Sequence, residues 1–283
     1  MGGYSVVGRC GVQRTFHYER QPGYNKLVGP GDAGLEYLEL GLLRVPRDEE
    51  FTFSQEGREA VLVMLSGACR VQVDAQQWNL ERVSVFAGPA MAVYVPRHRR
   101  YTVSGVKPAD LAVFSARSDQ DFLPRLIEAG QIRMEAEGAG SFRRRVYPIV
   151  DEAFPASRLL VGETFVEPGQ WASYPPHKHD EDRYPDEVRL EEAAFFQIDP
   201  PQGFALQYLY SADGALNQVY VMGNDDAFAA ARGYHPLATA PGYQVYYLWG
   251  MAGDGHLIRS SIDPAHAWVA AETGAPQPIA VPE

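Results

Sequence analysis

Residues 159–166 read LLVGETFV and are followed directly by Glu167-Pro168-Gly169. A short apolar run that ends in a turn signal is typical of a β-strand. Comparable runs recur along the chain at intervals of about 8 to 12 residues, a spacing typical of sandwiches and barrels. They lie at 35–45, 60–65, 69–73, 83–86, 92–95, 111–114, 195–198, 204–210, 218–222 and 243–248. The sequence therefore predicts an all-β protein.

A polar stretch, GQIRMEAEGAGSFRRR at 130–145, interrupts the series of strands. We interpret it as a linker and its three consecutive arginines as a solvated face. Strand-like runs precede and follow it, which predicts two β-barrels, at 1–140 and 141–283. The halves share no obvious sequence repeat, so duplication is inferred from the rhythm alone. The 27 Gly, 21 Pro and 16 Tyr also disfavour a helical bundle.

Composition narrows the classes of function. The 283 residues carry 25 Lys plus Arg against 36 Asp plus Glu, a net charge of −11, which argues against nucleic acid as a partner. The sequence contains no stretch of about 18 to 20 apolar residues, so a membrane-spanning helix is not predicted. Two cysteines, Cys10 and Cys69, are too few for a disulfide framework. The N-terminus lacks a signal-peptide pattern, so we expect a cytoplasmic location, and the Pro-rich tail from Gly274 is expected to be extended.

The segment 174–192, YPPHKHDEDRYPDEVRLEE, carries the residues best suited to chemistry. His177 and His179 are two residues apart, so on a strand both point to one face. Carboxylates follow, and the last of them, Glu192, opens an apolar strand-like run from which it could point into a barrel mouth. A third histidine, His235, stands in a turn-like context before an aromatic strand. Together these residues predict a mixed nitrogen and oxygen site for Mn²⁺, Fe²⁺, Zn²⁺, Ni²⁺ or Co²⁺ with positions open to a substrate.

These motifs resemble a known family. In the second half, Tyr-Pro-Pro precedes His-Lys-His, and these are followed by Leu-Glu-Glu, PPQGFA at 200–205, RGYHP at 232–236 and MAG at 251–253. In the first half, the matching motifs are REA at 58–60, LSG at 65–67 and VYVP at 93–96. The combination is similar to 5-deoxy-glucuronate isomerase of myo-inositol catabolism, related to 4-deoxy-L-threo-5-hexosulose-uronate ketol-isomerase of pectin breakdown. The resemblance covers nearly the whole chain. It implies a bicupin, built from two double-stranded β-helix (jelly-roll) barrels.

The resemblance implies that His177, His179, Glu192 and His235 are the metal ligands. The choice of Glu192 rests on the matching order of motifs, and Glu187 is the alternative carboxylate. The first half holds only His17 and His98, far apart, and is expected to be a degenerate cupin without a site. The family usually has Tyr-Tyr-His-Arg after Leu-Glu-Glu, whereas this chain has Ala-Phe-Phe-Gln at 194–197. The 225–231 segment also departs from the aliphatic strand usual in the family. These changes remove residues suited to contacting a substrate.

The reaction that the resemblance implies is an aldose–ketose isomerisation, from 5-deoxy-glucuronate to 5-dehydro-2-deoxy-gluconate through an enediol. A metal would polarise the carbonyl group, and a general base would move one proton. We expect Glu163 as the base and Tyr246, or its neighbour Tyr247, as the acid. Lys178, Arg183 or Arg232 is expected to meet the substrate carboxylate.

Two other functions fit the same residues. An Fe²⁺ cupin dioxygenase would use a similar site to activate O₂ and would consume oxygen. A non-catalytic sugar-binding cupin is kept open by Phe196 and Gln197. The expected partner is a small sugar acid, without nucleic acid or membrane, and a homo-oligomer formed through strand edges is compatible with the sequence.

Overall fold

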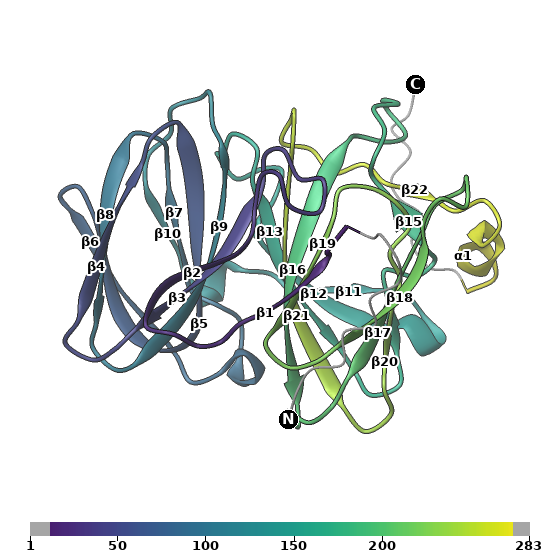
Figure 1. The fold of residues 1–283 in the computed structure, drawn as a ribbon, viewed down its shortest axis with the longest axis horizontal. Coiled ribbons are helices and arrows are strands. Elements are labelled where there is room, and N and C mark those ends of the chain that lie inside the picture. The colour runs from purple at the N-terminus through teal and green to yellow at the C-terminus, as the bar shows by residue number, and fades with distance from the viewer. Residues whose placement is uncertain (1–11, 274–283) are drawn as a thin grey trace.

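The computed structural model describes residues 12–273, which form two β-barrels side by side (Figure 1). Cys10 and the tail from Gly274 lie outside the described residues. Within these residues, helix is confined to the α-helix α1 (Ala267–Thr273) and the 3₁₀ turns η1 (Val85–Ala87), η2 (Ala129–Gln131) and η3 (Gly140–Phe142). The all-β prediction is therefore confirmed. No helix among residues 12–273 is long and apolar enough to cross a membrane.

The first barrel is one connected nine-stranded sheet that curls on itself. Its strands are β2 (Gly23–Val28), β3 (Glu39–Val45), β4 (Glu50–Gln55), β5 (Arg58–Val73), β6 (Gln76–Arg82), β7 (Ala92–Val95), β8 (Arg99–Gly105), β9 (Ala109–Arg117) and β10 (Arg125–Ile127). The long strand β5 pairs with β7 and β9 in one half and with β6 and β8 in the other. It therefore joins the two layers of the barrel.

The second barrel combines a seven-stranded sheet, a four-stranded sheet and a two-stranded ribbon. The seven-stranded sheet contains β1 (Thr15–His17), β11 (Glu135–Glu137), β12 (Arg144–Val150), β13 (Leu160–Val166), β16 (Leu190–Asp199), β19 (Asp226–Ala230) and β21 (Gln244–Gly253). The smaller sheets contain β14 (Trp171–Ala172), β17 (Ala205–Tyr210), β18 (Asn217–Met222) and β20 (Leu237–Thr239), and β15 (His177–Lys178) with β22 (Ser261–Ile262).

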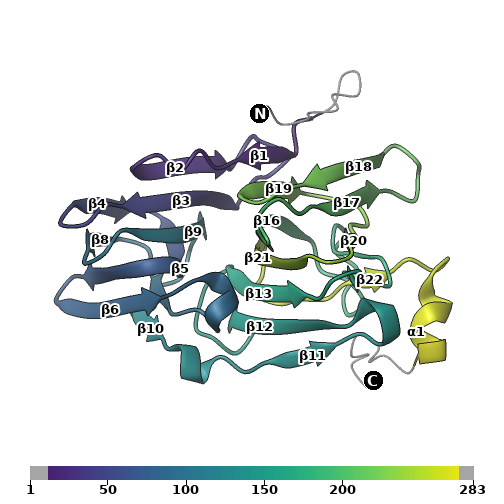
Figure 2. The same ribbon diagram turned by 90° about the horizontal axis from the view of Figure 1, so that it is seen from below.

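The large sheets of the two barrels pack face to face, so strands at the junction are buried on both faces (Figure 2). All seven residues of β13 are buried. Leu160 and Val166 belong to the core of the second barrel, whereas Val161 and Phe165 belong to the core between the barrels. This double burial explains why LLVGETFV is a continuous apolar run rather than an alternating one.

Two buried carboxylates hold the barrels together in a reciprocal way. Glu59 of the first barrel accepts hydrogen bonds from the backbone N–H groups of residues 157–159, at 2.7–2.9 Å. Glu191 of the second barrel accepts them from the N–H groups of Glu36 and Tyr37, at 2.6–3.0 Å. Each carboxylate satisfies backbone donors that burial would otherwise leave unpaired.

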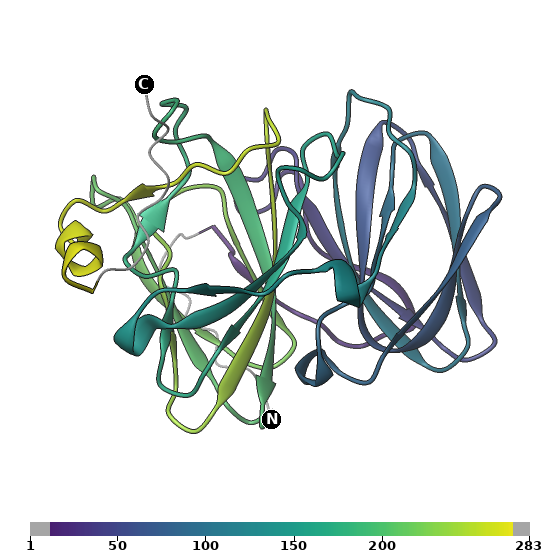
Figure 3. The ribbon, with the colours of Figure 1, turned by 180° about the vertical axis from the view of Figure 1, so that it is seen from behind.

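Strands from both ends of the predicted first domain contribute to the sheet of the second barrel. Strand β1 pairs with β19, with Thr15 opposite Phe228, and β11 pairs with β12 (Figure 3). The predicted boundary at residue 140 thus falls after β11, a strand that already belongs to the seven-stranded sheet of the second barrel. The division of the sheets follows pairing between distant segments, which a strand rhythm alone does not reveal.

Candidate metal centre

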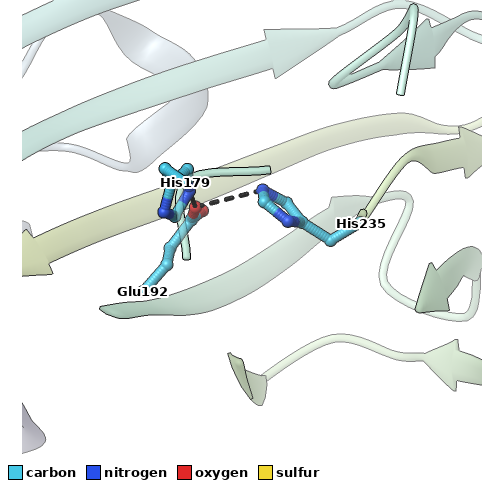
Figure 4. Close-up of side chains that lie close together, drawn as sticks. All are labelled: His179, Glu192 and His235. Carbon is cyan, nitrogen blue, oxygen red and sulfur yellow. Dashed lines mark hydrogen bonds and ion pairs between the residues drawn. The ribbon is translucent and has the colours of Figure 1, made fainter. Parts of the chain in front are cut away.

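Three of the predicted ligands, His179, Glu192 and His235, meet inside the second barrel (Figure 4). His179 directly follows β15, Glu192 lies in β16, and His235 lies just before β20. Nε2 of His179 is 3.1 Å from Oε2 of Glu192, and Nε2 of His235 is 3.3 Å from the same oxygen. One donor atom from each of the three side chains lies within 4.8 Å of the others.

The orientation of Glu192 follows from strand alternation in β16. Glu192, Ala194 and Phe196 line the same cavity, whereas Glu191 points to the other barrel and binds backbone N–H groups there. Glu192 lies between Ala230 of β19 and Met251 of β21 in the sheet. Its place in the middle of the sheet fixes the carboxylate at the barrel interior.

Backbone carbonyl groups orient the two histidine rings. Nδ1 of His179 is 2.8 Å from the oxygen of Leu190, and Nδ1 of His235 is 2.9 Å from the oxygen of Gly233. An Nδ1–H that donates to a carbonyl leaves Nε2 free to bind a metal, and this arrangement is common around metal-binding histidines. Nε2 of His235 is buried and has no hydrogen-bond donor among the described residues; the atom that faces it is the acceptor Oε2 of Glu192. Such an orphaned acceptor beside a carboxylate fits a bound cation.

The charges also suit a divalent cation. Burial alone would raise the pKa of Glu192, but the facing His235 and His179 outweigh it and hold the pKa well below its usual range. Burial opposes protonation of His179, yet its hydrogen bond to Glu192 raises the pKa of the imidazole. A divalent cation would displace that proton, because metal ligands must be deprotonated. The donor set of imidazoles and one ionised carboxylate therefore fits Zn²⁺ or a related first-row metal.

His177 lies next to these three side chains. Its ring centroid is 5.2 Å from that of His235 and 6.4 Å from that of His179. Burial, reinforced by His235 and His179, lowers the pKa of His177 well below its usual value. The ring is therefore neutral at pH 7 and carries a lone pair that can be offered to a cation.

Glu187, the alternative carboxylate, lies on the far side of β15 from the histidines. It accepts hydrogen bonds from Nζ of Lys178 at 2.8 Å and from the backbone N–H groups of Asp180 and Glu181. It also binds Arg183, at 2.7 Å, and the hydroxyl group of Ser261 in β22. Its oxygens are thus engaged in holding the 180–189 loop against the β15–β22 ribbon.

The role of Glu187 predicts an acid-sensitive contribution to stability. Burial works in the opposite direction, but hydrogen bonds from Lys178, Ser261 and Arg183 lower the pKa of Glu187 to about 2. A depressed pKa stabilises the fold above the unfolded value of about 4.3 and loses that effect as pH falls toward 2. We expect Glu187→Gln to lower the free energy of unfolding by about 2 kcal/mol at pH 7, since hydrogen bonds to charged groups contribute about that much.

Urea unfolding of wild type and Glu187→Gln between pH 7 and pH 2 measures this effect. The difference should shrink below about pH 4 as the wild-type carboxylate is protonated. Glu181→Gln is the matched control, because that side chain is 56% exposed and should change stability little. A difference that stays constant down to pH 2 would contradict the assigned pKa.

The cavity beside the donor cluster combines polar and apolar walls. Its polar lining is Ser173, Gln207 and Tyr247, and its apolar lining is Ala194, Phe196, Phe228, Ala230 and Leu237. Nε2 of Gln207 donates to the carbonyl oxygen of His235, at 2.7 Å, which links the cavity wall to a predicted ligand. Glu192 and His235 themselves form part of the cavity wall.

The two predicted catalytic residues, Glu163 and Tyr246, do not lie in this cavity. Both point out of the second barrel toward the first, where Glu163 binds Nη2 of Arg82 at 2.9 Å and the N–H of Ala90 at 2.8 Å. Tyr246 packs in the same core between the barrels. The physical reason is strand alternation: residues 161, 163 and 165 share one face of β13, and that face is the junction. Tyr247, the alternative, is the tyrosine that lines the cavity.

The three cations expected to meet the substrate carboxylate also lie outside the cavity. Nζ of Lys178 binds Asp180 and Glu187, and Arg183 binds Glu181 and Glu187 from an exposed position. Arg232 is exposed. The arginine on the inner face is Arg144, which belongs to the run interpreted as a solvated face. The alternation of RRVYPIV, with Arg144 in step with the buried Val146, is the signal that indicates its direction.

The described part of the first barrel lacks a comparable site. Its interior is filled by apolar side chains such as Leu62, Met64 and Val71. His98 lies in a turn with a φ of 59°. His17, in the strand β1 that joins the sheet of the second barrel, is exposed and paired with Asp226.

Fold and site together define a two-barrel protein of the cupin type, with one candidate metal centre in its second barrel. Residues 14–269 match the KduI/IolB family, and the chain belongs to that family. It is 36% identical to the 5-deoxy-glucuronate isomerase of Geobacillus thermodenitrificans over 258 residues, covering 90% of this chain and 94% of the relative. It is 32% identical to the 5-deoxy-glucuronate isomerase of Bacillus subtilis over 248 residues, covering 86% and 91%.

Solved structures agree with this assignment. The fold is similar to an IolB-like protein from Salmonella typhimurium, with a TM-score of 0.87, 32% identity and coverage of 91% of this chain and 99% of the other. Oxalate decarboxylase from Lactobacillus farciminis has a TM-score of 0.67 at 10% identity, covering 96% and 95%, a likeness of fold alone. The predicted family and the predicted bicupin architecture are confirmed.

Proposed function

We propose that this protein is a metal-dependent aldose–ketose isomerase that converts 5-deoxy-glucuronate to 5-dehydro-2-deoxy-gluconate in myo-inositol catabolism. Membership of the KduI/IolB family and the names of its relatives support the reaction. The observation that carries the proposal is the buried cluster of His179, Glu192 and His235 at the wall of a small cavity. The donor set suits a metal that binds two neighbouring oxygens of a substrate.

The proposed ligands are His177, His179, Glu192 and His235. A divalent metal held there would supply a Lewis acid that polarises the substrate carbonyl group. Isomerisation moves a proton between the two carbons that carry these oxygens, so the developing negative charge lies close to the cluster. Glu192 stays ionised because the pKa of its carboxyl is held low by His235 and His179.

Side chains of the cavity would orient the substrate and exclude water from it. Burial raises the pKa of Tyr247, so its hydroxyl group stays protonated and can donate a hydrogen bond to a substrate oxygen. Phe196, Phe228 and Leu237 exclude water from the reacting carbons, which strengthens the electrostatic interactions there. Gln207 fixes the backbone of His235 and thereby the position of its ring.

Metal analysis combined with an isomerase assay tests the proposal. Purified protein should contain about one divalent ion per chain, and it should convert 5-deoxy-glucuronate to the ketose, followed by NMR. Chelation should abolish turnover, and added metal should restore it. Full turnover by metal-free protein would contradict metal dependence, and oxygen consumption with Fe²⁺ would favour a dioxygenase.

A further inference from the structure

Arg144 is a cation on the inner face of the second barrel. It begins β12 and pairs with Val166 of β13, and both Val166 and Val146 belong to the core of this barrel. Its side chain is only 13% exposed. The next residue, Arg145, points to the opposite face, where it stacks on Phe165 and pairs with Glu167.

The contacts of Arg144 place it beside the segment that leads to the predicted ligand His177. Nη1 donates to the carbonyl oxygen of Tyr174, three residues before His177, at a donor–acceptor distance of 3.5 Å. Thr164 lies opposite Val146 of β12 and opposite Tyr247 of β21, so Arg144 and the cavity-lining Tyr247 share the inner face of this sheet. The guanidinium group thus lies beside the segment that leads to His177 and on the sheet face that carries Tyr247.

The present partner of Arg144 is a side chain that a substrate can replace. Nη2 is 2.5 Å from Oε2 of Glu137, a residue of the edge strand β11 whose side chain is 38% exposed. Glu137 lies directly opposite Arg144 in the sheet, so the pair is a cross-strand ion pair near the surface. A carboxylate is therefore already bound at this guanidinium, and a half-exposed side chain can give way to another carboxylate at small energetic cost.

We propose that Arg144 binds the carboxylate group of the sugar acid, while the carbonyl end of the same molecule lies at the His179–Glu192–His235 cluster. The inference rests on the proposed function, because it assigns the recognition of the substrate's charge. A planar guanidinium group can bind a carboxylate through two parallel hydrogen bonds, which fixes orientation as well as affinity. The positive charge of Arg144 also explains how a protein with a net charge of −11 can hold an anionic substrate.

Kinetics with two substrates test the assignment. One is 5-deoxy-glucuronate, and the other is its analogue with a primary alcohol in place of the carboxylate. We expect Arg144→Met to raise KM for the uronate about 10- to 100-fold, because a hydrogen bond to a charged group is lost. KM for the alcohol, kcat and metal content should change little. Arg144→Lys should restore part of the affinity, since it restores charge without the two-pronged geometry.

Two controls separate recognition from structure. Arg145→Met removes the neighbouring arginine on the outer face and should leave both KM values unchanged. Arg144→Met leaves Glu137 unpaired, so the double variant Arg144→Met/Glu137→Gln removes the repulsion that a free carboxylate would add. Its KM for the uronate should stay above the wild-type value. Melting temperatures establish that each variant is folded.

The outcomes also separate this inference from the proposed function. An equal loss on both substrates, or an unchanged KM for the uronate, would overturn the role of Arg144. If wild-type protein isomerises neither sugar, the proposed function is wrong, and calorimetric titration with 5-deoxy-glucuronate then tests Arg144 alone. Binding that is equally strong in wild type and Arg144→Met would overturn the inference in that case too.

Discussion

Glu192→Gln is expected to lose both the bound divalent metal and turnover. One carboxylate oxygen, Oε2, lies 3.1 Å from Nε2 of His179 and 3.3 Å from Nε2 of His235. An amide of the same shape preserves packing but removes the negative charge that a dication requires. Metal assistance contributes several kcal/mol to such reactions, so we expect kcat/KM to fall by about 10³-fold or more.

Metal content by mass spectrometry and turnover of 5-deoxy-glucuronate, measured on the same samples, give the result. Glu81→Gln is the control, since it makes the same change of charge on an exposed side chain of the first barrel. His179→Ala should behave like Glu192→Gln. His177→Ala decides whether the fourth proposed ligand binds metal: a lower metal affinity supports it, and unchanged affinity contradicts it. A Glu192→Gln protein that keeps its metal and its rate would overturn the assignment of the centre.

The donor cluster could be predicted from the sequence because the spacing of the histidines and the order of the family motifs indicated the same residues. Two-residue spacing predicted one face for His177 and His179, and the structure places both rings next to His235. The choice between adjacent carboxylates was harder. Strand β16 is buried on both faces, so the pattern LEEAAFFQI gives no sign of whether Glu191 or Glu192 faces inward. The order of motifs, rather than hydrophobic periodicity, selected Glu192.

Double burial also explains why the sequence does not reveal which way the predicted catalytic residues face. Glu163 and Tyr246 lie in strands whose residues are nearly all buried, because a second barrel covers their outer face. Periodicity cannot separate inside from outside when both sides are packed. The sheet partners that would settle the matter come from distant segments, as when Arg82 meets Glu163 from 81 residues away.

Turn signals in the sequence also do not always mark the end of a strand. The separate runs predicted at 60–65 and 69–73 form one strand, because β5 continues from Arg58 to Val73. The register shifts between Met64 and Ser66, and Gly67 has a φ of 90°, a conformation that favours glycine. A Cβ atom there would lie 1.9 Å from the carbonyl oxygen of Pro108. The glycine therefore marks an irregularity inside a strand, which its sequence context does not distinguish from a turn.

Arg82→Met is expected to destabilise the protein more than any change at the metal centre. Arg82 donates to both oxygens of Glu163 across the junction, at 2.9 and 3.2 Å, and both side chains are buried. When the guanidinium group is removed, the Glu163 carboxylate keeps the hydrogen bond from the N–H of Ala90 but loses those from Arg82. Loss of one partner from a buried pair costs about 3–5 kcal/mol, because the other charge stays in a poorly solvated place.

Glu163→Gln should cost less, and it separates structure from catalysis. Arg82 also donates to the carbonyl oxygens of Met64, Val85 and Gly88, so its charge stays solvated by the backbone when the carboxylate is neutralised. Urea unfolding should therefore rank wild type above Glu163→Gln and Glu163→Gln above Arg82→Met. The folded Glu163→Gln protein should keep its metal and a kcat within about threefold of wild type, because Glu163 faces the junction. A loss of about 10³-fold in kcat with the fold and metal intact would instead require Glu163 to act as the base.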